Sequence, residues 1–216
     1  MIVMIDMGLG NLRSVANAFR RIGLDVAVTE SPAEARRADA LILPGVGAFG
    51  DGMAGLAAKG LVEPIREHVL VEKKPLLGIC LGMQLLAERS EELGSHEGLG
   101  LLPGRITRLR PSSPQCRVPN MGWCDLTVRK RGVLFSGFPD GKSVYFAHSY
   151  HFACGDPDDA AATFDYCGDA VVAAVERDNL FGLQFHPEKS QDAGLAVLSA
   201  FAAHVGHAGA PVGERP

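Results

Sequence analysis

The amino-acid sequence predicts one α/β domain with a largely parallel central sheet, flanking helices and an antiparallel extension. Short apolar runs alternate with helical patterns in the first half of the chain, which is typical of parallel strands joined through helices. In the second half, strand-like runs are separated by Pro, Gly and Ser clusters. The length of 216 residues favours a single domain at about 150 residues per domain. We expect this domain to span residues 1–205 and to end in a disordered tail, 206–216.

The first half predicts four strands and the helices between them. The expected strands are 2–6, 25–28, 40–43 and 75–79. The expected helices are 12–22 after the N-cap Asn11, 32–38 after the cap Ser31 and the first-turn Pro32, 51–71 with interruptions near Gly60 and Pro64, and 81–89. Strands connected through helices pair in parallel with right-handed crossovers.

The second half predicts mainly strands, followed by one more helix. The expected strands are 105–109, 123–128, 144–152 and 161–166, then a hairpin of 170–176 and 180–185 around Arg177-Asp178-Asn179. An amphipathic helix over 192–205 closes the domain.

Composition excludes several classes of protein. The net charge of −4 supplies no basic excess for nucleic acid. Because no apolar run reaches about 18 residues and the first residues lack a basic region, we expect a cytoplasmic protein without a membrane span. The five cysteines include no C-x-x-C pair, so we expect neither a disulfide framework nor a zinc site. We interpret them as small buried side chains, apart from one candidate nucleophile.

That nucleophile is Cys80, in the segment Gly78-Ile79-Cys80-Leu81-Gly82 between an expected strand and an expected helix. This is the pattern of a nucleophile elbow with Cys in place of Ser. Glycines are needed there because side chains would collide with neighbouring backbone in so tight a turn. The helix N-terminus favours the thiolate. A small cysteine buried in an ordinary turn is the alternative that this segment alone leaves open.

A cysteine nucleophile needs a base, and His186 is the strongest of the seven histidines. It follows an apolar strand, and Pro187 holds it in an extended conformation from which Glu188 can reach its imidazole. The polar or terminal surroundings of His68, His96, His204 and His207 predict solvated side chains instead. His148 and His151 could add ligands for a metal at His186 and Glu188, but the spacing is not convincing. We therefore expect no metal and no cofactor.

Together, Gly78–Gln84 and Phe185-His186-Pro187-Glu188 resemble the motifs of the class I glutamine amidotransferases. Five segments are similar to the glutaminase subunits of imidazole glycerol phosphate synthases within that family. They are residues 5–12, residues 44–49 (Pro-Gly-Val-Gly-Ala-Phe), Met121-Gly122-Trp123, residues 145–150, and residues 184–190, which include the second motif.

The resemblance implies a catalytic triad of Cys80, His186 and Glu188 that hydrolyses glutamine through a thioester. It also implies an oxyanion hole and a glutamine pocket, with backbone N–H groups of Val46 and Leu81 in the first and Gly47, Gln84, Ser149 and Tyr150 in the second. Because Gly45 and Gly47 leave the Val46 peptide free to reorient, we hypothesise that a partner and its substrate complete the oxyanion hole.

The resemblance further implies a heterodimer with a cyclase subunit of (β/α)₈-barrel fold that uses the ammonia. Asn11, Trp123 and Lys189 would face this partner. Members usually carry a basic residue before Met-Gly-Trp and Asn after it, whereas this chain has Asn120 and Cys124. These departures bear on the partner contacts rather than on the triad.

Three other functions remain open on sequence alone. The chain could feed ammonia to another pathway, such as tryptophan, folate, pyridoxal or nucleotide synthesis, although residues 8–11 and 121–123 disfavour this. A non-catalytic subunit would have no reason to keep Cys80, His186 and Glu188. A cysteine peptidase or esterase built on the same elbow is the weakest alternative.

Overall fold

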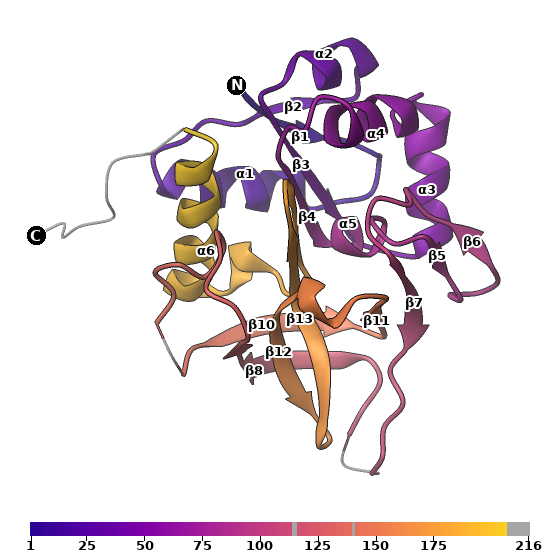
Figure 1. The fold of residues 1–216 in the computed structure, drawn as a ribbon, viewed down its shortest axis with the longest axis vertical. Helices are drawn as coiled ribbons and strands as arrows, with labels where there is room; N and C mark the ends of the chain where they lie inside the picture. Colours follow the sequence, from indigo (N-terminus) through magenta and orange to yellow (C-terminus); the bar gives the residue numbers. More distant parts are fainter. Residues whose placement is uncertain (114–115, 140, 207–216) are drawn as a thin grey trace, which may run out of the picture.

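A computed structural model describes residues 1–113, 116–139 and 141–206, and its core is an eight-stranded sheet (Figure 1). The strand order is β2-β1-β3-β4-β14-β13-β12-β9. The parallel part consists of β1 (Ile2–Ile5), β2 (Ala27–Thr29), β3 (Ala40–Gly45), β4 (Leu76–Cys80) and β14 (Leu180–Leu183). The antiparallel part adds β13 (Asp169–Arg177), β12 (Ala160–Tyr166) and β9 (Thr127–Val128). The predicted fold class is thus confirmed.

Helices cover both faces of this sheet because its strands are apolar on both sides (Figure 1). Ile2 and Met4 of β1 point into a core shared with α1 (Leu12–Arg21) and α6 (Gln191–His204). Val3 and Ile5 point into the opposite core. That core contains α2 (Pro32–Arg37), α3 (Phe49–Ala58) and α4 (Val62–Leu70). The alternation along β1 therefore divides the interior into two layers.

Two smaller sheets, which the sequence did not separate from the main one, complete the domain. One pairs β8 (Asn120–Asp125) with β10 (Ser143–His148), and the other has the order β11-β7-β5-β6. The strands of the second sheet are β11 (Tyr150–Cys154), β7 (Gly104–Arg108), β5 (Arg89–Ser90) and β6 (His96–Glu97). The chain passes from one sheet to the other at Ser149, whose carbonyl accepts from the N–H of Leu109. The single strand expected over 144–152 is therefore two strands.

The helices differ from the sequence expectations in two places. The helix after Cys80, α5 (Leu81–Gln84), is shorter than expected because the carbonyls of Leu85 and Leu86 accept from residues 99, 101 and 102 instead of continuing the helix. The expected interruption near Gly60 is present, with φ +65°, but Pro64 does not interrupt α4. Pro64 lies in the first turn, where its missing N–H costs no helical hydrogen bond.

Several side chains also differ from the expectations. Asn11 and Ser31 occupy N-cap positions, but neither side chain makes a capping hydrogen bond. His68, expected in solvent, is only 1% exposed, and its Nε2 lies 3.1 Å from the carbonyl of Pro75. Burial lowers the pKa of His68, so its ring is neutral at pH 7.

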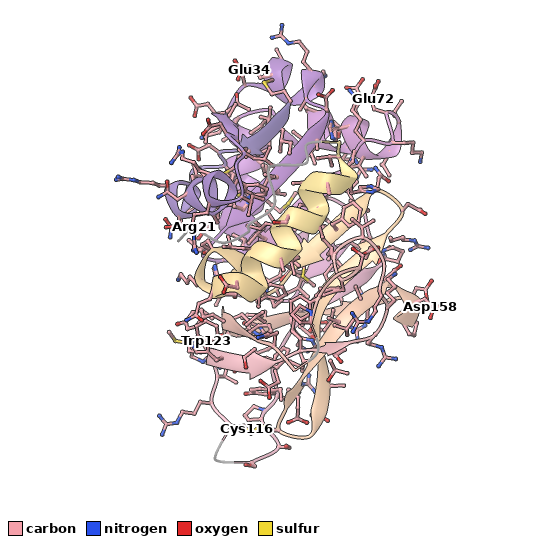
Figure 2. All side chains as sticks on the ribbon, turned by 90° about the vertical axis from the view of Figure 1, so that its left-hand side faces the viewer. Arg21, Glu34, Glu72, Cys116, Trp123 and Asp158 are labelled. Atoms are coloured by element: carbon pink, nitrogen blue, oxygen red, sulfur yellow. A yellow bond between two sulfur atoms is a disulfide. The ribbon has the colours of Figure 1, made fainter. Side chains whose placement is uncertain are left out.

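The cysteines depart furthest from the sequence interpretation. Cys116 and Cys167 form a disulfide that joins the loop before β8 to the β12–β13 turn, so these two are not simple buried side chains (Figure 2). Cys124 and Cys154 are free and half-buried, and Cys80 is free and buried.

Two expectations concern the ends of the chain and the membrane. Apart from Gly206, the tail expected over 206–216 lies outside the described residues. Within the described ranges, none of the helices combines the length and the apolar composition needed to cross a bilayer.

Candidate active site

Cys80 ends β4 and immediately precedes α5, in a backbone conformation that side chains rarely adopt. Its φ is +52°, the left-handed region of a strained turn. The turn can form only because Gly78 and Gly82 have no side chains. A Cβ on Gly82 would lie 1.6 Å from the carbonyl oxygen of Leu43, and one on Gly78 would lie 2.6 Å from that of Gly82. The glycines of the elbow thus serve the close approach that the sequence predicts.

His186 follows β14, which is paired in parallel with β4, so the carboxyl ends of the two strands are adjacent. Its Nδ1 lies 2.9 Å from Oε1 of Glu188, the second residue of the short 3₁₀ helix η2 (Pro187–Lys189). The other carboxylate oxygen of Glu188, Oε2, is buried without a hydrogen-bond partner in the described chain. The charge of Glu188 is therefore directed mainly at the imidazole.

The environment of His186 favours its charged form. Burial lowers the pKa of His186, but hydrogen bonds with Cys80 and Glu188 outweigh it and raise this pKa to about 9. Nδ1 is the ring nitrogen that faces Glu188. The arrangement can hold an imidazolium between a sulfur and a carboxylate at neutral pH.

Cys80 and His186 open into a cavity of about 340 Å³. Seven other residues that the sequence singled out also line it: Val46, Gly47, Leu81, Gln84, Ser149, Tyr150 and Lys189. Glu188 lies behind His186, and Asn11 and Trp123 lie outside the cavity. The volume is within the range of small-molecule sites.

Gln84 lies on the floor of this cavity and is only 5% exposed. Its Nε2 donates to the carbonyl of Tyr150 and to Oε1 of Gln184, both at 2.9 Å. These two bonds occupy both amide hydrogens, so Oε1 is the atom of Gln84 available to a ligand ammonium group.

Sequence reasoning missed roles for Gln184 and Glu92. Gln184 is fully buried, and its Nε2 lies 3.8 Å from Sγ of Cys80. The period of two in extended chain could have found it, because Gln184 precedes His186 by two residues. Glu92 lines the cavity and accepts from the N–H of Phe49 at 2.7 Å. No simple sequence signal points to Glu92, which follows the unexpected strand β5.

A partly apolar surface adjoins the cavity. Trp123 lies at the surface, where it is 49% exposed (Figure 2). It packs edge-on against the ring of Tyr145, with 6.0 Å between ring centroids. The Nζ of Lys189 lies 5.4 Å from the centroid of the same ring. Met121, on the strand that carries Trp123, is 65% exposed. Asn11 is also exposed, at the start of α1, a helix that packs against η2.

Comparison with known proteins identifies the family. The model of the family "Glutamine amidotransferase class-I" matches residues 3–205. The chain belongs to the class I glutamine amidotransferases. Two relatives are each 49% identical to it and are named imidazole glycerol phosphate synthase subunit HisH. The Syntrophotalea carbinolica protein aligns over 93% of this chain and 98% of its own length, and the Moorella thermoacetica protein over 96% and 97%.

Solved structures confirm the amidotransferase fold at lower sequence identity. A crystal structure titled glutamine amidotransferase superposes with a TM-score of 0.75 at 20% identity, covering 95% of this chain and all of the other. The structure of PurLQS from Thermotoga maritima gives a TM-score of 0.72 at 21% identity, covering 94% and 98%.

Proposed function

We propose that this amidotransferase is the cytoplasmic glutaminase subunit of an imidazole glycerol phosphate synthase in histidine biosynthesis. The observation that carries the proposal is the meeting of Cys80, His186 and Glu188 at adjacent strand ends, in a chain 49% identical to proteins named HisH. The likeness to HisH extends over nearly the whole chain, which favours this pathway over the other ammonia-consuming pathways.

In the proposed reaction, the thiolate of Cys80 attacks the side-chain amide carbon of glutamine. The tetrahedral intermediate collapses to a thioester as His186 gives its proton to the departing nitrogen, which leaves as ammonia. Neutral His186 then takes a proton from water, whose oxygen attacks the thioester. Glutamate leaves, and the proton returns to the sulfur–imidazole pair. Glu188 holds the ring orientation and stabilises the imidazolium throughout.

Two backbone N–H groups would stabilise the oxyanion in both steps. Leu81 supplies one from the first turn of α5, and Val46 supplies the other from the Gly45–Gly47 turn. Gly47 has φ +105°, and the turn lies at the cavity wall. We retain the hypothesis that the Val46 peptide completes the hole only with the partner and its substrate engaged. Equal glutaminase turnover with and without the partner would contradict it.

The amino-acid end of glutamine fits the polar part of the cavity. The Oε1 atom of Gln84 and the carboxylate of Glu92 offer acceptors for its ammonium group. Gly47 permits close approach, and the peptide groups of Ser149 and Tyr150 form the facing wall. Glu92 is an addition to the residues that the sequence predicts for this role.

We further propose that the partner is a cyclase subunit of (β/α)₈-barrel fold, which docks over Trp123, Lys189 and Asn11. Free ammonia is protonated and lost in water, so a glutaminase must deliver it directly. Exposed aromatic and Met side chains commonly anchor such interfaces, and Trp123 and Met121 lie beside the cavity. Asn120 and Cys124 stand on the same strand, so the departures from the usual family residues fall within this surface.

The test is glutamate release from glutamine by the purified subunit, with and without a cyclase subunit and its ribulosyl substrate. Stimulation by cyclase plus substrate supports the proposal. Cys80→Ala should abolish release yet still form the complex, since its Cβ keeps the elbow intact. The half-buried Cys154, away from the cavity, offers the matched control: Cys154→Ala should retain turnover. Turnover retained by Cys80→Ala would overturn the assignment of the nucleophile.

A further inference from the structure

Gln184 is a fully buried polar residue that the proposed triad does not use. Its backbone N–H is already bonded to the carbonyl of Ala173, at 2.8 Å, so its side chain is carried by a fixed segment. The side-chain amide lies between two residues of the site: Nε2 is 3.8 Å from Sγ of Cys80, and Oε1 is 2.9 Å from Nε2 of Gln84. Burying such an amide between Cys80 and Gln84 costs free energy unless both its NH₂ group and its oxygen form hydrogen bonds.

The direction of each bond follows from one backbone atom. The carbonyl of Tyr150 can only accept, so Gln84 must present its NH₂ group to it. The second hydrogen of that NH₂ then requires an acceptor, which is Oε1 of Gln184. Gln184 must therefore turn its own NH₂ toward Cys80, where it donates to sulfur. The orientation of both amides is set by the hydrogen-bond network itself.

The same carbonyl also starts a second branch. It accepts from Nδ1 of His148 at 2.8 Å. Burial lowers the pKa of His148 to about 4, so the ring is neutral at pH 7 and its Nε2 is an acceptor. The Nδ2 group of Asn120 faces that Nε2 at 3.4 Å, across the β8–β10 pair.

We propose that Gln184 is a positioning residue for Cys80, held in its donating orientation by a hydrogen-bond chain through Gln84, the Tyr150 carbonyl and His148 to Asn120. This inference rests on the proposed glutaminase function. The amide of Gln184 stabilises negative charge on the sulfur from the side opposite to solvent, while its Oε1 keeps Gln84 aligned for glutamine. The side chain of Gln184 thus holds Cys80 and Gln84 in a fixed position relative to each other.

Two substitutions separate these two tasks. Gln184→Met keeps the length of the side chain but removes both the donor and the acceptor. Gln184→Glu keeps an acceptor for Gln84 while replacing the donor to sulfur by a negative charge. We expect both to lower kcat about 10- to 100-fold, the scale of one hydrogen bond to a charged group. Only Gln184→Met should also raise KM for glutamine, because only it releases Gln84.

The decisive measurement is the pH dependence of Cys80 alkylation by iodoacetamide, followed by mass spectrometry of the Cys80 peptide. In both variants the profile should move to higher pH by about one unit, because the thiolate loses its donor. A merely structural loss would lower stability without moving this profile. Asn179→Ala provides that control, since it removes a half-buried amide that donates to the carbonyls of Val69 and Lys74, away from the cavity.

The outer end of the chain is tested at Asn120. Asn120→Ala leaves Nε2 of His148 without its donor, so the ring can change tautomer and release the Tyr150 carbonyl. We expect a rise of about two- to fivefold in KM, with kcat nearly unchanged. Asp125→Ala, at the other end of the same strand, is the control and should leave both constants unchanged, because its carboxylate accepts from Ser143, outside this hydrogen-bond chain.

The outcomes are distinguishable from failure of the proposed function. If the wild-type chain releases no glutamate even with a cyclase subunit and its substrate, the proposed function falls. If Cys80→Ala retains turnover, the assignment of Cys80 as the nucleophile falls. If Cys80→Ala is inactive while both Gln184 variants keep the wild-type alkylation profile and kcat, the positioning role is overturned. If Asn120→Ala alone leaves KM unchanged, the role of Gln184 stands, and the part of the hydrogen-bond chain that runs through His148 to Asn120 is overturned.

Discussion

The cavity has two walls, and the histidine on one wall is charged whereas the histidine on the other is neutral. One wall is the pair of strand ends that carries Cys80 and His186, and the other is the β10–β11 junction that carries His148. The two histidines are similarly buried, at 4% and 6% exposure. Yet the pKa of His186 is raised to about 9, whereas that of His148 is lowered to about 4. The groups that contact each imidazole, rather than its burial, therefore decide whether it is charged.

The partners explain the contrast. His186 faces a carboxylate and a thiol, which together stabilise an imidazolium. His148 faces a backbone carbonyl and the amide of Asn120, which suit a neutral ring. The strand-end wall can thus hold a separated charge pair for proton transfer, and the antiparallel wall supplies neutral hydrogen bonds for positioning. The two walls also differ in packing, and that difference supplies the largest expected effect.

We expect Gly82→Ala to destabilise the fold by at least about 4 kcal/mol and Gly122→Ala by only about 1 kcal/mol. The first adds a Cβ 1.6 Å from the carbonyl oxygen of Leu43, which cannot move without displacing β3. The second, on β8, adds a Cβ in open space and costs only the strain of its φ of +142°. Urea unfolding of both variants measures the difference, and equal losses would show that the elbow is no tighter than the opposite wall.

Glu188→Gln removes the charge that distinguishes the first wall. We expect kcat to fall on the order of 10²–10⁴-fold, because the amide no longer stabilises the imidazolium and can favour the wrong ring tautomer. The raised pKa of His186 should fall toward that of an ordinary histidine, so the alkaline limb of the activity profile moves to lower pH. A pH series of kcat from 6 to 10 measures both effects. An unshifted alkaline limb would contradict the role of Glu188.

The sequence predicts the first wall far better than the second. Cys80 and His186 lie at the ends of strands buried on both faces, where local patterns and the elbow glycines identify them. Their approach follows from the parallel pairing of β4 and β14. A short-range pattern was therefore sufficient, because the fold class itself brings the strand ends together.

The second wall depends on contacts that no local pattern contains. The run 144–152 looks like one strand, and only the bond from Leu109 to Ser149 shows where the chain changes sheet. The disulfide between Cys116 and Cys167 joins residues 51 positions apart, and the sequence offered no spacing that pairs them. The early end of α5 likewise follows from residues 99–102, whose N–H groups donate to the carbonyls of Leu85, Leu86 and Ala87 just after the helix. Tertiary hydrogen bonds decide each case.

The last of these effects concerns the charge of His148 on the second wall. The pKa of His148 in the folded protein is about 4, below the 6.5 of an unfolded histidine. Between these values the unfolded chain binds more protons, so folding stability is lost as pH falls from 6.5 to 4. His186 has the opposite sign: its raised pKa gives stability that is fully present below pH 6.5 and is lost as pH rises through about 9.

His148→Gln should therefore lose about 2–3 kcal/mol less stability than the wild type between pH 6.5 and pH 4.5. Glutamine can still donate to the carbonyl of Tyr150 and accept from Asn120, but it does not titrate. Urea unfolding at both pH values gives the difference, in which the carboxylates and His68 cancel because both proteins share them. His204→Gln, at an exposed position of α6, is the matched control and should follow the wild type. Parallel losses in His148→Gln and wild type would mean that His148 does not resist protonation, and the two walls would then not differ in charge.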